Sequence, residues 1–158
     1  MTHDTEALSG LLAKIEAATG PDQVIDAHLV CVLLAPPEAF VSIGPISGMA
    51  RVCIGVNARG ADIVWGHWIK WIDTPLTASI DAALALVERV LPGHKAGFQP
   101  GIAGKFRGHI LAITPTSAFY VMDTIAPTAP LAILGSLLKV LINRSASAAL
   151  AQGGHHEA

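Results

Sequence analysis

"TASIDAALALVERVLPG", residues 77 to 93, is the stretch that decides the fold. Its large apolar side chains recur at helical spacing: Ile80, Leu84, Val87 and Leu91. Thr77 or Ser79 can cap the N-terminus of a helix, and Asp81 lies in the first turn, where the helix dipole favours a negative charge. Pro92 and Gly93 end the pattern. The stretch therefore predicts a single helix with segments of β character on both sides.

The segments on either side of this helix predict antiparallel strands. After it, "HKAGFQPG", "KFRGHILAITP" and "SAFYVMD" read as three strands, with Phe106 to Ile113 and Ala118 to Met122 as the firmest pair. Before it, Arg51 to Val56 predicts a strand, "NARG" a turn, and Ile63 to Trp65 the returning strand. Whether the whole of Pro36 to Ile72 forms regular strands is left open by its many glycines.

Three further helices complete the pattern. "TEALSGLLAKIEAATG" and "PDQVIDAHLVCVLLA" predict an antiparallel pair joined by a short turn, with Asp22 as the cap of the second helix. The last helix is expected from about Thr128 to Asn143. The order predicts an α+β fold, an α/β/α sandwich in which a small antiparallel sheet is covered by helices. We expect one domain over residues 1–145 and a flexible C-terminal tail over 146–158.

Composition limits the classes of function. Of the 158 residues, 52% are hydrophobic and 14% charged, which favours a large core with apolar surface left for another protein or a second copy. The helix from Leu131 to Ile142 is apolar on more than one side, so a homo-oligomer through it is one possibility. A net charge of −2 does not indicate nucleic-acid binding. The apolar run from Ala129 to Ile142 is shorter than the roughly 20 residues that a membrane span needs, and the acidic N-terminal residues do not have the pattern of a signal peptide, so we expect neither.

Three segments carry a resemblance to a known family. The matching residues are Leu11, Ile15, Glu16, Ala17, Gly20, Pro21, Asp26, Ala27, Thr77, Ala78, Ser79, Ile80, Asp81, Ala82, Ala83, Leu84, Leu86, Val87, Ala129, Pro130, Leu131 and Ala132. Their order resembles the phage ABA sandwich domain family of small phage and prophage proteins. Leu76 departs from the aromatic residue common there, and the last helix lacks the usual Cys-Ile-Ala-Ala-Leu run. The resemblance implies an α/β/α sandwich and a phage context. Because no targeting segment is recognised, we expect the protein in the cytoplasm of a bacterial host cell. The family has no known activity, so no catalytic residue is carried over.

The motifs that would indicate chemistry are incomplete. "GFQPGIAGKF" places Gln99 and Phe106 where a phosphate-binding loop needs Gly and a hydroxyl residue, so we expect no nucleotide cofactor. His28 and Cys31 lie one helical turn apart, but a metal site needs three or four ligands, so we expect no metal. We interpret Cys31 and Cys53 as reduced, buried thiols.

Ionisable residues do not define a catalytic set either. Asp22 and Asp26 have a spacing that suggests helix capping and solvent exposure. An enzyme would need scattered groups such as His94, His109 and Asp81 to converge in one pocket. We expect no catalytic residues and keep such a dispersed site only as an alternative.

The three tryptophans are the remaining candidates. Trp65, Trp68 and Trp71 follow one another at intervals of three, with Lys70 among them. Structural packing is the favoured interpretation, and a partner-binding edge is the alternative, because tryptophan is enriched at interface hot spots. The leading hypothesis is a non-enzymatic phage accessory protein that binds another protein, with interference in host or defence machinery as one role. An assembly role in the phage particle is a further alternative.

Overall fold

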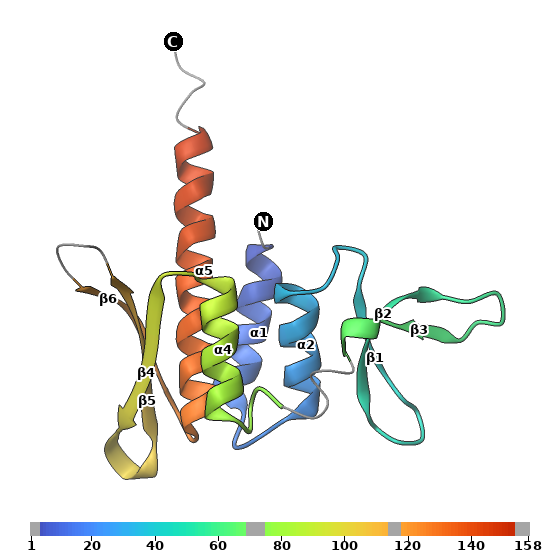
Figure 1. Cartoon of the computed structure of the whole chain (residues 1–158), viewed down its shortest axis with the longest axis horizontal. Coiled ribbons are helices and arrows are strands. Elements are labelled where there is room, and N and C mark those ends of the chain that lie inside the picture. The colour runs from blue at the N-terminus through green and yellow to red at the C-terminus, as the bar shows by residue number, and fades with distance from the viewer. Residues whose placement is uncertain (1–3, 69–74, 114–117, 154–158) are drawn as a thin grey trace.

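The computed structural model describes residues 4–68, 75–113 and 118–153. In these residues, α-helices occupy the middle of the molecule, and one antiparallel sheet lies on each side (Figure 1). The helices are α1 (Thr5–Ala17), α2 (Gln23–Leu33), α4 (Ile80–Val90) and α5 (Ala129–Gly153). The first sheet has the order β1 (Phe40–Ile43), β2 (Ala50–Val56), β3 (Asp62–Val64), and the second has β4 (His94–Pro100), β5 (Phe106–Ile113), β6 (Ala118–Ala126). Two short 3-10 helices are η1 (Gly66–Trp68) and η2 (Ile102–Gly104).

Side-chain caps fix where three of the helices begin. The carboxylate of Asp4 accepts the N–H of Glu6 at the start of α1. Asp22 accepts two N–H groups of α2, at 2.7 and 3.1 Å, and Ser79 accepts the N–H of Ala82 in α4. Each cap satisfies donors that have no partner inside the helix and contributes about 1 kcal/mol. Asp22 is confirmed as the predicted cap of α2, and of the two predicted candidates for α4, Thr77 and Ser79, the cap is Ser79.

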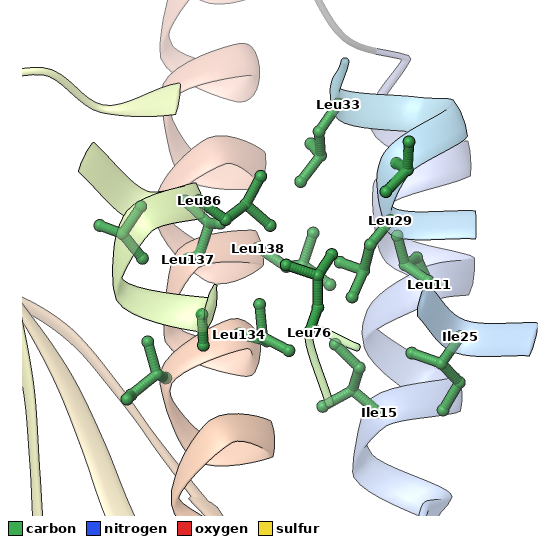
Figure 2. Close-up of a cluster of buried hydrophobic side chains, with 14 of the residues drawn as sticks. Leu11, Ile15, Ile25, Leu29, Leu33, Leu76, Leu86, Leu134, Leu137 and Leu138 are labelled. Carbon is green, nitrogen blue, oxygen red and sulfur yellow. The ribbon is translucent and has the colours of Figure 1, made fainter. Parts of the chain in front are cut away.

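The main core lies between α5 and α4 on one side and α1 and α2 on the other. Figure 2 shows leucine and isoleucine side chains from these helices pointing toward one another. Leu76, in the segment before α4, also enters this core and is fully buried. Each such side chain contributes roughly 1.5–3 kcal/mol relative to its exposed state. The core is therefore the principal source of stability for the helical layer.

The β4–β6 sheet approaches α5 closely because glycines stand at the contact. A Cβ atom added at Gly108 in β5 would lie 2.2 Å from the carbonyl carbon of Ala132 in α5. On the helix side, a Cβ at Gly135 would lie 2.7 Å from the Cγ2 atom of Thr124. The hydroxyl of Ser136 donates to the carbonyl of Gly108 at 3.0 Å. Backbone therefore packs on backbone along this part of the interface.

The β1–β3 sheet packs against α2 and extends away from the helical layer (Figure 1). Ala50, Val52 and Cys53 of β2 are buried, which anchors the central strand. Cys31 of α2 donates its thiol to the carbonyl of Ala39 at 3.4 Å. Only the anchored part of this small sheet is covered, and its remainder faces solvent.

The predicted fold class, α+β with antiparallel strands packed on helices, is confirmed. The strands within Pro36 to Ile72 and the three strands after α4 are present. The strands form two sheets with helices between them, where the sequence suggested one sheet covered by helices, because the first three strands pack on α2 and the last three on α5. The one-domain organisation stays a prediction.

The last helix is longer than predicted. α5 runs to Gly153, whereas its predicted end was at about Asn143. The residues beyond Asn143 are rich in alanine, which has the highest helix propensity, and they continue the helix although most of them are exposed. Part of the segment expected as a tail is thus helical, and residues 154–158 lie outside the described residues.

With its full length, α5 is also longer than the apolar run that was judged too short to span a membrane. The segment Ala129–Ala151 has 23 residues and a mean hydropathy of 1.3, so by length and composition it could cross a membrane. Its apolar side chains are buried in the protein's own core: Leu131, Leu134, Leu137, Leu138 and Leu141. These side chains pack in the core of the chain itself, so the apolar face that suggested oligomerisation is already covered within the chain.

Candidate functional site

The tryptophans do not form a shared exposed platform in the described residues. Trp68 of η1 is 1% exposed, and Trp65 is half-buried against the core. The ring of Trp65 lies 5.2 Å from that of His67. The other two candidates, Lys70 and Trp71, lie outside the described residues. Packing is thus the role of Trp68, and of the two tryptophans in the described residues only Trp65 is partly open to a partner.

The neighbouring β1–β3 sheet carries the exposed apolar surface instead. Seven of the eleven large hydrophobic side chains exposed in the described residues lie between positions 40 and 63. They are Phe40, Ile43, Ile46, Met49, Ile54, Val56 and Ile63, and Ile46 is fully exposed. We call this set the sheet surface. The set comes from both faces of the sheet, because Phe40 and Ile43 have opposite parity in β1, and from the loop between β1 and β2, where Ile46 and Met49 lie. Larger groups of exposed apolar side chains on a soluble protein often mark a binding surface.

The backbone around the sheet surface also offers places for a partner. In the described residues, β2 is central, and the outer edges of β1 and β3 pair with no further strand. Positions 40 to 63 hold only three charged residues, Arg51, Arg59 and Asp62, and Asp62 accepts a hydrogen bond from Ser42. Open edges with few charges are the kind of edge to which a strand from another chain adds.

A separate cavity of about 270 Å³ lies at the N-terminal end of α2. Its lining residues are Pro21, Asp22, Gln23, Asp26, Trp68, Pro75 and Ala78. Thr77 holds the two sides of the cavity together. Its N–H donates to the Oδ1 atom of Asp26 at 2.8 Å, and its hydroxyl accepts the N–H of Asp22 at 2.9 Å. These bonds join α2 to a segment more than 50 positions away, so the cavity wall is firmly held.

Asp26 corrects one expectation from the sequence. It was predicted to be solvent-exposed, but it is only 2% exposed, because the segment that contains Leu76 and Thr77 covers this part of α2. Burial raises the pKa of the Asp26 carboxyl, and the charge of Asp22 raises it further, while the hydrogen bonds from Thr77 oppose this. A buried carboxyl of this kind is costly unless something compensates its charge.

The remaining ionisable candidates serve local structure. His28 contacts the carbonyl of Val24 through Nδ1 and the amine of Lys14 through Nε2. Both cysteines are free thiols; Cys53 is buried as predicted, whereas Cys31 is only half-buried, and burial raises the pKa of each. Within residues 4–68, 75–113 and 118–153, no group of three or more metal-ligating side chains occurs.

His94 and His109 do not face a common pocket. His94 pairs with Ala112 across the β4–β5 ladder, whereas His109 pairs with Gly97. Positions 94 and 97 have opposite parity, so the two side chains lie on opposite faces of the sheet. His94 faces α5, where its Nε2 atom lies 2.9 Å from the guanidinium of Arg144. Asp81 is exposed in the first turn of α4.

A second cavity, of about 620 Å³, lies at the tip of the β4–β5 hairpin. It includes the segment that was considered as a phosphate-binding loop, with Ile102 and Lys105 among its lining residues. Arg107 also lines it but is engaged with Asp123 at 3.1 Å. Ile102 is 89% exposed, so this cavity is open to solvent. Its lining has fewer exposed large hydrophobic side chains than the sheet surface has.

Comparison of the chain with protein-family models, with curated proteins and with solved structures gives no match. The resemblance to the phage ABA sandwich domain family therefore stays a prediction from the motifs. Sequence reasoning missed the sheet surface because alternating apolar residues in a strand are normally read as one buried face. The only signal for it was the general excess of apolar residues over charged ones.

Proposed function

We propose that this protein is a non-enzymatic module that binds another protein through the sheet surface of β1–β3. The observation that carries the proposal is the concentration of exposed apolar side chains there, from Phe40 to the fully exposed Ile46 and on to Ile63. Burying such side chains against a partner stabilises the complex by about 25 cal/mol per Å² of apolar area removed from water. This is the main favourable contribution to protein association.

The chemistry of the surface favours a protein over other partners. A nucleic acid would require a basic surface, but positions 40 to 63 contain two arginines and one aspartate. A small molecule would require a concave apolar pocket, whereas the exposed side chains lie on a sheet that extends outward (Figure 1). The partner we infer presents an apolar face, with an extended strand that can add to the edge of β1 or β3.

The biological setting we propose follows the motif resemblance. A phage or prophage accessory protein that acts in the bacterial cytoplasm would use this surface to engage a host or defence protein. An assembly role in the phage particle would use the same surface on another phage protein or on a second copy of this chain. Both settings require the sheet surface to be covered in the working complex.

The test is capture by variants that change only this surface. Ile46→Asp and Ile43→Asp place charges at exposed positions, and Leu150→Asp does the same on α5, where Leu150 is 80% exposed. We expect a partner captured from host lysate by the unaltered protein and by Leu150→Asp, and lost with Ile43→Asp/Ile46→Asp. Sedimentation of the purified chain shows whether the partner is a second copy. Equal capture by all three proteins would refute the proposed surface.

A further inference from the structure

We propose that copies of this chain associate head to tail, with the β1–β2 turn of one copy seated in the cavity at the β4–β5 hairpin tip of the next. The turn belongs to the sheet surface, so the inference rests on the proposed function and names a second copy of this chain as the partner. One copy can use both surfaces at once, because the two sheets lie on opposite sides of the helical layer (Figure 1).

The exposed apolar side chains are concentrated in these two sheets. Of the eleven large hydrophobic side chains exposed in the described residues, seven form the sheet surface, three lie in the β4–β6 sheet with its η2 turn, and one is Leu150. The three are Phe98, Ile102 and Ile125. Two apolar groups on opposite sides of one molecule cannot cover each other, but those of neighbouring copies can.

The two surfaces have complementary shapes. Ile46 lies in the turn between β1 and β2 and is 100% exposed, so no other described part of the chain covers its side chain. The hairpin cavity has a volume of about 620 Å³, and Pro100, Ile102 and Ile125 form much of its apolar lining. A cavity of about 150 Å³ is enough for a benzene-sized group, so the hairpin cavity has room for Ile46 together with side chains next to it.

The polar groups of the two surfaces are complementary as well. The turn, residues 44–49, has no charged side chain, and in the described residues the carbonyl oxygens at 45–47 accept no hydrogen bond. Lys105 and Gln99 line the cavity, and Lys105 forms no ion pair with a described residue. Both side chains can donate to the carbonyl oxygens of the turn, and a neutral turn brings no like charge to the lysine.

The backbone of the hairpin fixes the shape of the cavity before a partner arrives. The N–H of Gly101 donates to the carbonyl of Lys105 at 2.7 Å, and the N–H of Lys105 donates to the carbonyl of Ile102 at 3.3 Å. Within this turn, Ala103 has a φ of 56°, in the left-handed region that residues other than glycine rarely adopt. Such strained residues are concentrated at functional sites, and Ala103 lines the cavity.

The contact joins two different surfaces, so two copies do not close it. A pair of copies still has one free turn and one free cavity, and further copies can add at both ends. The assembly therefore grows past the dimer, as an open chain or as a ring. A turn in a cavity is a small interface, so we expect the association to be weak and to depend on protein concentration.

Two substitutions and their mixture test this arrangement by sedimentation velocity of the purified full chain. Ile46→Asp changes the turn and leaves the cavity intact, whereas Ile102→Asp changes the cavity and leaves the turn intact. The unaltered chain should form species larger than a dimer as its concentration rises to about 1 mM. Each variant alone should associate at least about tenfold more weakly, because a charge would be buried in an apolar contact. An equimolar mixture of the two variants should form a heterodimer and nothing larger, since one intact turn and one intact cavity remain to pair.

Leu150→Asp is the matched control, because it places the same charge at an exposed apolar position outside both surfaces. This variant should assemble as the unaltered chain does. Association lost with Ile46→Asp but kept with Ile102→Asp would show a symmetric contact between two sheet surfaces and would overturn the inference. An unaltered chain that stays monomeric overturns it too. If that monomer still captures another protein through Ile46, the proposed function stands and only the head-to-tail contact fails.

Discussion

Replacing Gly108 with alanine should destabilise the protein strongly. The new Cβ atom would lie 2.2 Å from the carbonyl carbon, 2.3 Å from the carbonyl oxygen of Ala132 and 2.5 Å from the nitrogen of Ile133. All three atoms belong to the backbone of α5, so no side-chain rotation can relieve the overlap. The β5 strand and the helix must move apart, and this movement disturbs the hydrogen bond from Ser136 to the carbonyl of Gly108.

The magnitude follows from these two effects. Overpacking in a well-packed interior costs about 1–3 kcal/mol, and a backbone overlap belongs at the upper end of that range. Ser136 can keep its hydrogen bond to the carbonyl of Ala132 at 2.9 Å, so loss of its contact with Gly108 adds less than about 1 kcal/mol, and we expect Gly108→Ala to cost about 3 kcal/mol. For a chain of this size, about 3 kcal/mol lowers the melting temperature by about 6 to 12 °C.

Urea unfolding followed by far-ultraviolet circular dichroism measures this cost. Gly10→Ala is the matched control, because Gly10 lies in α1 with open space around its Cβ position. That variant should be more stable by about 0.5–1 kcal/mol, since alanine is favoured over glycine inside a helix. A Gly108→Ala protein within about 1 kcal/mol of the unaltered chain would refute the close packing of β5 on α5.

Substitutions at three further residues test other parts of the structure by urea unfolding. Because the pKa of Asp26 is raised, the folded state holds its proton more tightly than the unfolded chain, so stability falls as pH rises from about 3.9 through the folded-state pKa. Asp26→Asn should abolish that fall and be more stable than the unaltered chain at pH 7, and an unchanged pH profile would contradict this. Leu134→Ala empties part of the core and should cost about 2–5 kcal/mol, while a cost below about 1 kcal/mol would argue against its burial. Asp22→Ala should cost about 1 kcal/mol through loss of the α2 cap and Asp22→Asn almost nothing, so equal effects of the two would deny the capping role.

Local signals in the sequence predicted most of the secondary structure. Capping residues such as Asp22 and Ser79 and the periodic leucines located the helices, because these effects act within a few residues. The end of α5 was misplaced, because a polar, alanine-rich segment fits both a tail and a solvated helix. The division into two sheets depends on which helix each group of strands packs against. The spacing of residues along the chain does not predict that packing.

The candidate sites were harder to predict for a related reason. Asp26 and Thr77 lie in separate motifs, and only the folded chain shows that they are hydrogen-bonded and that Asp26 is buried. The exposed side chains of the sheet surface look in the sequence like any half-buried strand. Trp68 was considered as a partner contact, but it is buried, whereas isoleucines of the neighbouring sheet are exposed.

The most direct test of the proposed interface is photo-crosslinking from the sheet surface itself. A photoactivatable side chain placed at Ile46, which is fully exposed, and separately at Leu150, which is 80% exposed, probes two apolar positions on different elements. Irradiation in host lysate followed by mass spectrometry should give one reproducible protein, or this chain itself, cross-linked from position 46 and not from position 150. The same cross-linked products from both positions, or none from position 46, would contradict a protein-binding role for the β1–β3 sheet.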